Sequence, residues 1–394
     1  MQLFRSMRNF IALLFFALLG VQLFGQSLSD MSFGEDNTLE VVTWNIEWFP
    51  KQGQTTVDSV IQIIRALDVD VLALQEISDT LKFKQMLNSL EGYEGSIEST
   101  WFAGLAYVYK TATVEIQDIY EIYYTDPYWN AFPRSPLVME MRFKGEDFVI
   151  INNHFKCCGD GILDLSYVGD EETRRYYASN LLKQYIDSNF PDENVILLGD
   201  LNDILTDDPE HNVFQVFLDD SDRYYFADME IAMGSSSGWS YPGWPSHLDH
   251  ILVTNELFEE IGDGSSVIQT LKIGNYLPGG FWEYDQKISD HRPVAMKIQT
   301  GLNSAIREEV VQRQTLKVFP NPSWGETLFM FEPVTENAVL SIHNVNGQEI
   351  KRVDLRKGEN LISWNVSELP VGMYYIYLYT GSRIVARNKL VVTK

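Results

Sequence analysis

The stretch Asn194-Val-Ile-Leu-Leu-Gly-Asp-Leu-Asn-Asp203 decides the fold class. Its first five residues have the apolar density of a buried strand, and a polar Gly-Asp-Leu-Asn turn follows directly. Residues 170–189 before it have the pattern of a helix capped by Asp170. Phe148-Val-Ile-Ile-Asn152, earlier still, predicts another strand. The order strand, helix, strand indicates an α/β protein.

The same order occurs near the start of the chain. Leu39-Glu-Val-Val-Thr-Trp-Asn45 alternates as a strand does, residues 57–67 have apolar side chains at helical spacing, and Val69-Asp-Val-Leu-Ala-Leu-Gln75 predicts a buried strand. Further strands are predicted at Gly104–Tyr109, Leu137–Arg142, Asp249–Val253 and Val294–Ile298. These elements predict a layered α/β sandwich over residues 39–300.

The chain of 394 residues is strongly acidic. Fifty-five acidic against thirty basic side chains give a formal charge of −25. This excludes a protein that grips nucleic acid through a broadly basic surface, so a polyanionic substrate would be met locally, with divalent cations as the obvious charge. Acidity also fits a secreted protein that is simply kept soluble.

The N-terminus has the pattern of a secretory signal over residues 1–26. Arg5 and Arg8 precede the apolar run Phe10-Ile-Ala-Leu-Leu-Phe-Phe-Ala-Leu-Leu-Gly20, and small residues follow where cleavage would occur. A retained anchor is the alternative, but the run is short for a membrane span of about 20 residues. Residues 27–38 are polar and rich in turn formers, which predicts a flexible lead-in.

Polar residues stand at the ends of the predicted strands. Asn45, Glu76, His154, Asp200 with Asn202, and Asp290 with His291 each follow or precede an apolar strand. Each could separately be a turn residue or a helix cap. Seven such residues in one ordered series predict a common site at one edge of the sheets.

Eight short motifs carry a family resemblance. They are Thr43-Trp-Asn45-Ile, Leu74-Gln-Glu76-Ile, Gly104-Leu-Ala-Tyr-Val-Tyr109, Arg134-Ser-Pro136, Asn152-Asn-His154-Phe, Gly199-Asp200-Leu-Asn202-Asp203, His247-Leu-Asp249-His-Ile-Leu252 and Ser289-Asp290-His291-Arg-Pro293. In order and spelling they resemble the endonuclease/exonuclease/phosphatase superfamily over some 250 residues. The resemblance implies a four-layered α/β sandwich that hydrolyses phosphoesters.

The resemblance also implies catalytic roles. In-line attack of water on phosphorus needs a base, a charge-stabilising cation and a partner for the leaving oxygen. His291 is expected to be the general base, oriented by Asp249. Asp200 would hold the attacking water or a second metal, Asn202 would bind a phosphate oxygen, and His154 would donate to the developing charge or the leaving oxygen.

Glu76 and Asn45 are expected to bind Mg²⁺ or Mn²⁺, with Asp290 completing that shell or the next. Arg134 is expected to grip a phosphate as a fork, and Asn152 to contribute to phosphate binding. A Ca²⁺ ion is possible in the acidic run Asp203, Asp207, Asp208 and Glu210, although such loops are more often only solvated.

Two features depart from the family pattern. Ser78 stands where deoxyribonuclease I-like enzymes carry an arginine that reaches DNA, and the loop Phe155–Gly161 is not a general family feature. That loop holds the only two cysteines, Cys157 and Cys158, which could form a vicinal disulfide, remain thiols or bind a soft metal.

Downstream of the loop, an aromatic cluster of Trp239, Tyr241 and Trp244 lies among glycines and prolines. It could stack bases or cover the site, or it could be a packed loop.

After residue 300 the pattern changes. Residues 301–314 predict a linker, and residues 315–394 predict a small all-β sandwich with turns at Asn346-Gly347, Lys357-Gly358 and Gly381. Its motifs are Lys317-Val-Phe-Pro-Asn-Pro322, Ile342-His-Asn-Val-Asn-Gly347 and Leu369-Pro-Val-Gly-Met-Tyr374. They resemble the type A C-terminal sorting domain of the type IX secretion system, with a carbohydrate-binding or adhesion module as the alternative.

Together these features predict a secreted, monomeric, metal-dependent phosphodiesterase with no stable membrane span after signal removal. A nuclease acting on DNA or RNA is the first hypothesis. A phosphatase on small substrates or a sphingomyelinase-like phospholipase C is the second, and a catalytically dead surface binding module is the third. The type IX machinery is the expected partner in export.

Overall fold

The computed structural model describes residues 27–97, 103–262, 264–300, 316–335, 337–344, 349–380 and 383–394. The chain divides into two compact units, Met1–Ala305 and Ile306–Lys394, which are described separately. The predicted signal, the predicted linker and the turns expected at Asn346-Gly347 and Gly381 lie outside the described residues.

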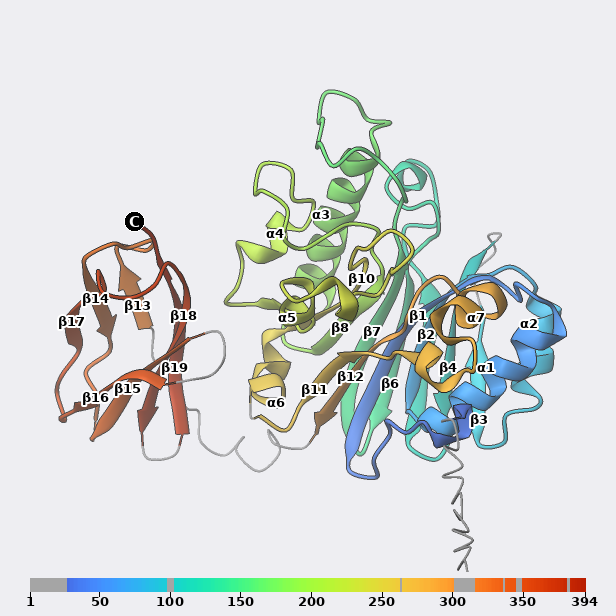
Figure 1. Ribbon diagram of the computed structural model, residues 1–394, viewed down its shortest axis with the longest axis horizontal. Coiled ribbons are helices and arrows are strands. Elements are labelled where there is room, and N and C mark those ends of the chain that lie inside the picture. The colour runs from blue at the N-terminus through green and yellow to red at the C-terminus, as the bar shows by residue number, and fades with distance from the viewer. Residues whose placement is uncertain are drawn as a thin grey trace, which may run out of the picture. The chain divides into compact units, whose positions relative to one another are not determined.

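The first unit contains two six-stranded sheets (Figure 1). One sheet has the strand order β11-β12-β1-β2-β4-β3. Its strands are β1 Thr38–Phe49, β2 Val71–Ile77, β3 Tyr93–Ser96, β4 Gly104–Lys110, β11 Val267–Thr270 and β12 Val294–Gln299. The other sheet has the order β5-β6-β7-β8-β10-β9. Its strands are β5 Val114–Glu121, β6 Leu137–Phe143, β7 Glu146–His154, β8 Asn194–Asp200, β9 Tyr224–Phe226 and β10 Asp249–Thr254.

Helices cover the outer faces of both sheets. The α-helices are α1 Gln54–Leu67, α2 Thr80–Leu87, α3 Glu171–Asn189, α4 Gln215–Leu218, α5 Met229–Ala232, α6 Phe258–Gly262 and α7 Gly280–Lys287. Short 3-10 helices are η1 Leu28–Asp30, η2 Tyr128–Asn130, η3 Ser236–Gly238, η4 Asn255–Leu257 and η5 Ile273–Tyr276. Side chains of α1, α2 and α7 pack on the first sheet, and those of α3, α4 and α5 on the second. A third core lies between the sheets, so the predicted four-layered α/β sandwich is confirmed.

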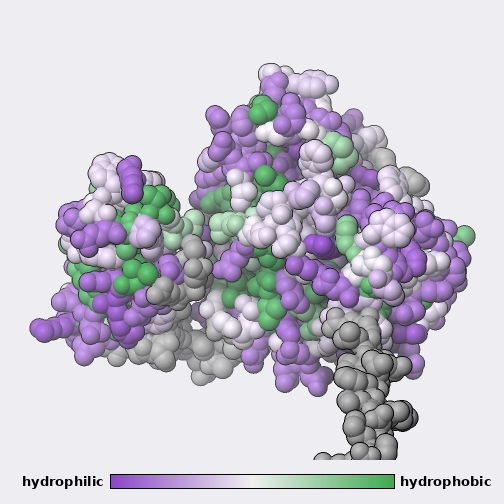
Figure 2. Space-filling view, viewed as in Figure 1, coloured by the Kyte–Doolittle hydropathy of each residue, from purple (hydrophilic) through white to green (hydrophobic). Residues whose placement is uncertain are grey.

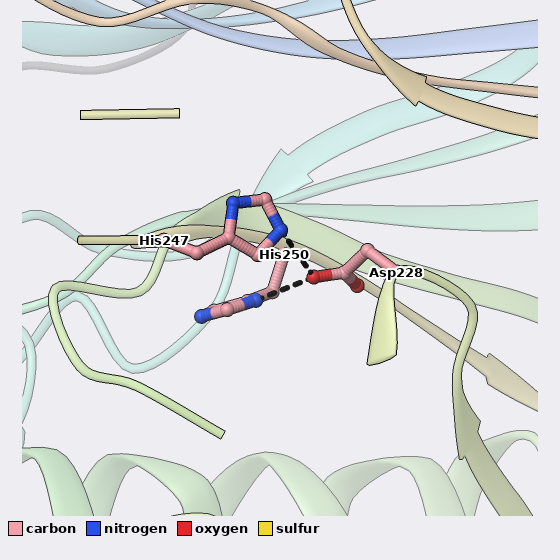
Figure 3. Close-up of side chains that lie close together, drawn as sticks. All are labelled: Asp228, His247 and His250. Carbon is pink, nitrogen blue, oxygen red and sulfur yellow. Dashed lines mark hydrogen bonds and ion pairs between the residues drawn. The ribbon is translucent and has the colours of Figure 1, made fainter. Parts of the chain in front are cut away.

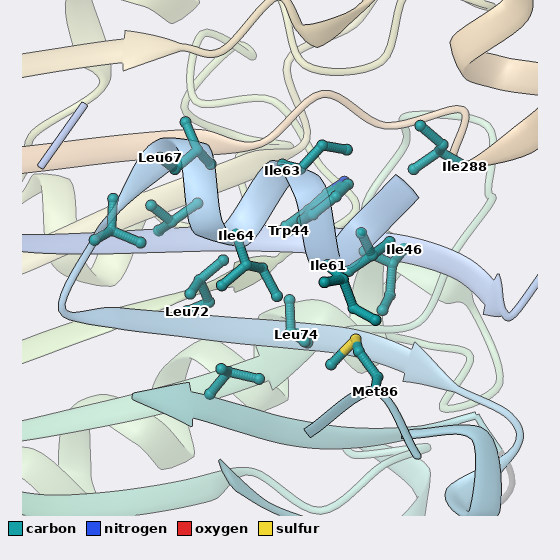
Figure 4. Packing of buried hydrophobic residues seen from close by; sticks show 14 of the residues in the cluster. Trp44, Ile46, Ile61, Ile63, Ile64, Leu67, Leu72, Leu74, Met86 and Ile288 are labelled. Carbon is teal, nitrogen blue, oxygen red and sulfur yellow. The ribbon is translucent and has the colours of Figure 1, made fainter. Parts of the chain in front are cut away.

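Helix α1 shows how the sequence builds one of these layers. Its apolar residues, spaced at three and four positions, form one buried stripe against β1 and β2 (Figure 4). Burying each such Ile or Leu side chain stabilises the fold by about 1.5–3 kcal/mol. Asp68 ends the helix in a left-handed conformation, and its amide donates to Ile64 O at 3.1 Å.

The segment expected to be a flexible lead-in is instead packed. Leu28, Met31 and Phe33 are buried in the same core as α1. The backbone amides of Phe33 and Gly34 donate to Leu67 O at 3.2 and 2.8 Å. The turn-rich composition of residues 27–38 concealed these three apolar anchors, whose burial outweighs the entropy of a short polar segment.

The second unit consists of antiparallel strands in two sheets, ordered β13-β14-β17 and β16-β15-β18-β19. The strands are β13 Leu316–Phe319, β14 Glu326–Phe331, β15 Ala338–Asn344, β16 Glu349–Leu355, β17 Leu361–Asn365, β18 Gly372–Thr380 and β19 Arg383–Val392. Apolar side chains from both sheets share one core, including Phe329, Leu340 and Ile376. The predicted all-β sandwich is confirmed.

Hydrophilic residues predominate on the face drawn in Figure 2, with smaller apolar patches between them. Among the described helices, none is both long and apolar enough to span a membrane.

Candidate active site

The strand directions bring the predicted polar residues to one edge of the two sheets. In the second sheet His154 pairs with Asp200, and Asp200 pairs with Asp249. Strands β7 and β8 are parallel and end there, whereas β10 is antiparallel to β8 and begins there. In the first sheet β12 runs antiparallel to β1, so the Asp290-His291 loop before β12 reaches the same edge.

The backbone conformation explains which residues occupy the Gly-Asp-Leu-Asn turn. A Cβ atom on Gly199 would lie 2.0 Å from Asn153 O, so only glycine lets β7 and β8 approach this closely. Asn202 has a φ of 54°, a left-handed conformation that Asn tolerates better than most residues. The turn therefore fixes the direction in which Asp200 leaves the sheet.

Asp200 is the centre of the cluster. Its Oδ2 accepts a 2.9 Å hydrogen bond from Asn45 Nδ2, and it lies 3.5 Å from His154 Nε2 and 3.7 Å from His291 Nε2. Burial, and less strongly the carboxylates of Asp249 and Glu76, raise the pKa of Asp200 to about 7, against the opposing effects of His291 and Asn45. This carboxyl therefore exchanges a proton near neutral pH.

His291 and Asp249 form a buried pair. His291 Nδ1 lies 2.7 Å from Asp249 Oδ2, which leaves Nε2 turned towards Asp200. Burial alone would lower the pKa of His291, but Asp249, Asp200 and Asp290 outweigh it and raise the pKa to about 10. The geometry is that of an imidazole oriented by one carboxylate, with its second nitrogen available to a reactant.

His154 lies on the other side of Asp200. Burial, with the charges of Arg134 and His291, holds the pKa of His154 well below its usual range, so this imidazole is neutral. Its Nε2 is 3.9 Å from Glu76 Oε1, and within the described part of the chain its Nδ1 has no hydrogen-bond partner. Arg134 is half-buried nearby and donates through Nε to Ala103 O at 3.3 Å.

Glu76 and Asp290 bring two further carboxylates to the first sheet's side of the cluster. Glu76 has a φ of 65°, and its Oε2 accepts from Trp48 N at 2.9 Å. Asp290 is partly exposed, and its Oδ1 is 4.0 Å from His291 Nε2. These are hard oxygen donors of the kind that Mg²⁺ and Mn²⁺ prefer, so the donor chemistry fits such an ion.

Asn45, expected to be a metal ligand, makes hydrogen bonds through both ends of its side-chain amide. Its Oδ1 accepts from Glu47 N at 2.9 Å, while its Nδ2 donates to both Glu76 and Asp200. As oriented, Asn45 holds two carboxylates together, and its oxygen accepts one hydrogen bond with a second lone pair remaining.

Glu47 is a residue of the site that sequence reasoning missed. Its Oε2 accepts from Asp290 N at 2.9 Å, and it is paired with Lys51, which also contacts Asp285 at 3.3 Å. Burial raises the pKa of Glu47, with Lys51 opposing and Asp290 adding to the rise. The sequence signal available was its position two residues after Asn45, whereas the loss of register between β1 and β2 at this point is seen in the structure.

Asn152, expected to bind phosphate, lies away from this cluster. Its side chain is fully buried between the sheets, donates to Leu74 O and Ala106 O, and accepts from Gln75 Nε2 at 2.8 Å. These bonds use both N–H groups and one lone pair of the amide, and they tie the two sheets together beneath the site.

The acidic run after β8 is not arranged around an open cation position. Asp203 Oδ2 accepts from Arg175 Nε at 2.8 Å, and its Oδ1 accepts from Ile204 N. Burial and the neighbouring Asp203 raise the pKa of Asp207 to about 6. The Arg175 guanidinium thus compensates the charge of Asp203, the first residue of the run for which the sequence suggested Ca²⁺.

Sequence reasoning also missed the hydrogen bonds that hold the backbone of His291 in place. Ser289 Oγ donates to Asn45 O at 2.6 Å and accepts from His291 N at 2.9 Å. Tyr284 OH donates to His291 O at 2.5 Å and accepts from Trp44 Nε1 at 2.9 Å. Ser289 and Trp44 stand inside the quoted motifs, but their bonds join segments some 240 residues apart, which no local pattern reports.

A second buried cluster consists of Asp228, His247 and His250 (Figure 3). Asp228 Oδ2 is 2.6 Å from His250 Nδ1 and 3.0 Å from His247 Nε2. His250 Nε2 faces the carbonyl of Asp203 at 2.8 Å, so both of its nitrogens face acceptors and both carry protons. Burial opposes this charge, but Asp228 outweighs it and raises the pKa of His250.

His247 completes this network through both of its ring nitrogens. Its Nδ1 accepts from Ser240 N at 3.3 Å, which requires the proton on Nε2, facing Asp228. A metal on Nε2 would leave Nδ1 protonated against that donor, so the geometry favours protons over a metal ion here. The network joins β10 to the loop after β8 and thereby supports Asp249.

The loop of the two cysteines forms a rim beside α3. Both are exposed thiols, and Cys158 Sγ donates to Cys157 Sγ at 3.1 Å. The buried Arg175 holds the loop by donating to the carbonyls of Lys156 and Cys158, each at 2.7 Å.

Comparisons with known proteins agree with this fold. The sequence profile of the Endonuclease/Exonuclease/phosphatase family matches residues 42–291, and that of the Secretion system C-terminal sorting domain matches residues 317–393. A comparison with curated proteins finds no match.

Solved structures resemble the first unit. D. rerio TDP2 complexed with a single-strand DNA product has 13% identity and a TM-score of 0.50, covering 67% of this chain and 100% of that one. The human Nocturnin catalytic domain with bound sulfate has 16% identity and a TM-score of 0.49, covering 66% and 94%. An endonuclease/exonuclease/phosphatase from Bacteroides vulgatus has 14% identity and a TM-score of 0.45, covering 66% and 98%.

The matched family profile spans the whole site, from β1 to His291. The C-terminal profile covers the all-β unit and confirms the predicted sorting domain. The chain therefore belongs to the endonuclease/exonuclease/phosphatase family, whose members are enzymes that hydrolyse phosphoester bonds.

Proposed function

We propose that the protein is a secreted, divalent-metal-dependent phosphodiesterase, and that its substrate is extracellular DNA or RNA. The observation that carries the proposal is the buried His291–Asp249 pair with its free nitrogen directed at Asp200, beside the carboxylates Glu76 and Asp290. A base, an acceptor for a water proton and hard metal donors thus converge on one position.

His291 is the general base in this proposal. Asp249 fixes the ring through Nδ1, so Nε2 takes the proton of a water that attacks phosphorus in line. Asp200 accepts a second hydrogen bond from that water and keeps it oriented. Asp249, Asp200 and Asp290 raise the pKa of His291, so a cation bound beside Asp290 and Asp200 would lower it.

Three residues serve the phosphate and the leaving oxygen. The neutral His154 donates to the leaving oxygen, Arg134 attracts the phosphate, and Asn202 donates to a phosphate oxygen. Glu76 and Asp290 would hold a Mg²⁺- or Mn²⁺-type ion, which supplies charge stabilisation to the phosphate when bound. Asn45 positions Glu76 and Asp200 for these tasks.

Nucleic acid is the substrate we favour because it is the commonest phosphodiester outside cells. The alternatives within the fold are a phosphatase on small substrates and a sphingomyelinase-like phospholipase C, which release inorganic phosphate or phosphocholine. The third hypothesis, a dead binding module, is not favoured because the catalytic set Glu76, Asp200, Asn202 and His291 is complete.

A substrate panel decides between these readings. Purified protein with Mg²⁺ or Mn²⁺ is tested on plasmid DNA, RNA, inositol phosphates and sphingomyelin. Degradation of DNA or RNA is expected, and release of phosphate or phosphocholine without any nuclease activity would refute the nuclease proposal. His291→Ala and chelation should each abolish turnover with folding intact, and activity that survives both would refute the mechanism.

We further propose that the type IX machinery exports the protein to the cell surface or the medium, after the predicted signal at residues 1–26 has directed it across the inner membrane. The sorting-domain match over residues 317–393 supports this route.

A further inference from the structure

A hollow of about 430 Å³ adjoins the candidate active site. Asn202 and Leu248 lie in its wall. Asn202 is two residues beyond Asp200, where β8 ends, and Leu248 directly precedes Asp249, where β10 begins. Its size is within the range of pockets that hold small organic groups. The hollow therefore lies where the part of a substrate next to the scissile phosphate would lie.

One wall of the hollow is Trp244, at the tip of a closed hairpin. The hairpin is defined by reciprocal bonds between Tyr241 and Ser246, at 3.0 and 3.1 Å. Pro242 and Pro245 stiffen it, and Ser246 Oγ donates to Trp244 O at 2.6 Å. Trp244 is nevertheless 81% exposed, so its ring is presented to the surroundings by a rigid turn.

The same hairpin contacts the catalytic histidine. The Tyr241 ring lies on the His291 imidazole, with 4.8 Å between centroids and 40° between planes. The hairpin thus fixes Trp244 relative to the proposed general base. An exposed indole held in this way has apolar and π surface to offer a planar ring.

The floor of the hollow is acidic. Glu172, Asp203 and Asp207 line it, and Arg175 is the one Lys or Arg among the described residues that do. The Arg175 guanidinium is already engaged by Asp203, by Glu172 at 3.1 Å and by two backbone carbonyls. A second phosphate would be repelled there, whereas the N–H groups of an uncharged ring would find acceptors.

We propose that this hollow binds one nucleobase, that of the nucleotide flanking the scissile phosphate, stacked on Trp244. The inference rests on the proposed nuclease function and specifies how that site holds its substrate. Base stacking on an aromatic side chain tolerates every base, so the hollow supports turnover of mixed sequences.

The test compares two single-stranded oligodeoxynucleotides of equal length. One carries bases, and the other has tetrahydrofuran residues in place of all nucleosides. Trp244→Ala should lower kcat/KM for the base-bearing strand roughly ten- to a hundredfold and leave the abasic strand unchanged. Trp244→Phe should retain most of the activity.

Trp282→Ala is the matched control, because Trp282 is 72% exposed on α7 and does not line the hollow. This variant should leave kcat/KM unchanged for both the base-bearing and the abasic strand. An equal loss on both strands, or no loss on either, in the Trp244→Ala protein would overturn the inference. A loss seen only with a phosphocholine ester would assign the hollow to a quaternary ammonium group and would also overturn it.

Failure of the function itself gives a different result. If the wild-type protein cleaves bis(4-nitrophenyl) phosphate but neither DNA nor RNA, the nuclease proposal fails and the inference falls with it. Cleavage of nucleic acid with no dependence on Trp244 refutes the inference alone.

Discussion

At the scale of single residues, the carboxylate behind His291 makes the most direct prediction. A general base works in its deprotonated form, so the rate falls as pH drops below its pKa. Asp249 raises the pKa of His291, so Asp249→Asn should move the acidic limb of the pH–rate profile to lower pH. It should also lower kcat/KM by about 10²- to 10⁴-fold, because the ring loses its orientation.

The measurement is kcat/KM on a phosphodiester from acidic to alkaline pH at constant metal concentration. Thermal unfolding of the variant checks that the fold is intact. An acidic limb at the wild-type position would show that Asp249 does not act through the titration of His291.

A second prediction at this scale concerns stability. His250 and His247 hold the pKa of Asp228 below its usual value of 3.8, despite the burial that would raise it. The contribution of Asp228 to the free energy of unfolding is fully present above pH 3.8 and is lost as the pH falls through its folded-state pKa. His250 has a pKa raised above 6.5, so its contribution is present below pH 6.5 and is lost as pH rises through the folded-state pKa.

The pair therefore stabilises the fold most between pH 3.8 and pH 6.5. Asp228→Asn should lower the free energy of unfolding by roughly 3–5 kcal/mol in that window, since it leaves a buried imidazolium without its partner. Urea unfolding at several pH values measures this. The difference between wild type and His250→Gln should shrink as pH rises above the window, and a pH-independent difference would contradict the ionised pair.

At the scale of elements, the central strands were predictable and the edge strands were not. Strands β1, β2, β7 and β8 are buried on both faces, so their sequences are dense in apolar residues. The edge strand β5 is largely exposed and mixes charged with apolar residues, and β11 has only four residues. Such edge strands form because a neighbouring strand pairs with them and fixes their register. The local sequence pattern carries no information about that neighbour.

The same reasoning separates the predictable from the missed residues of the site. Asp200 and His291 stand in short motifs whose turns need particular residues, as Gly199 shows. Glu47 and Tyr284 act through bonds to segments that only tertiary folding brings near. The sequence motifs thus predicted the reactive side chains, whereas the residues that hold them in position were identified only in the structure.

Gly199 yields the prediction at this scale. In Gly199→Ala the new Cβ would meet Asn153 O at 2.0 Å, and because that atom is backbone, β7 and β8 must separate beneath His154 and Asp200. We expect a loss of several kcal/mol in stability and a large loss of kcat/KM. Gly238→Ala is the control, since its Cβ would meet nothing within 4 Å. Equal behaviour of the two variants, by urea unfolding and kinetics, would contradict the steric argument.

At the scale of the whole molecule, catalysis and export are assigned to separate units. Every residue of the candidate site lies within Met1–Ala305, and the sorting-domain match lies within Ile306–Lys394.

Deletion of residues 306–394 should therefore leave kcat/KM within about twofold of the full chain, since each unit has its own core. In a host with a type IX secretion system, the same deletion should keep the protein in the periplasm, whereas the full chain reaches the surface or medium. Full-length His291→Ala should be exported normally, which separates folding and export from activity. Immunoblots of cell fractions with nuclease assays on each fraction measure both effects, and export of the shortened chain at the full-length rate would refute the assignment of sorting to the second unit.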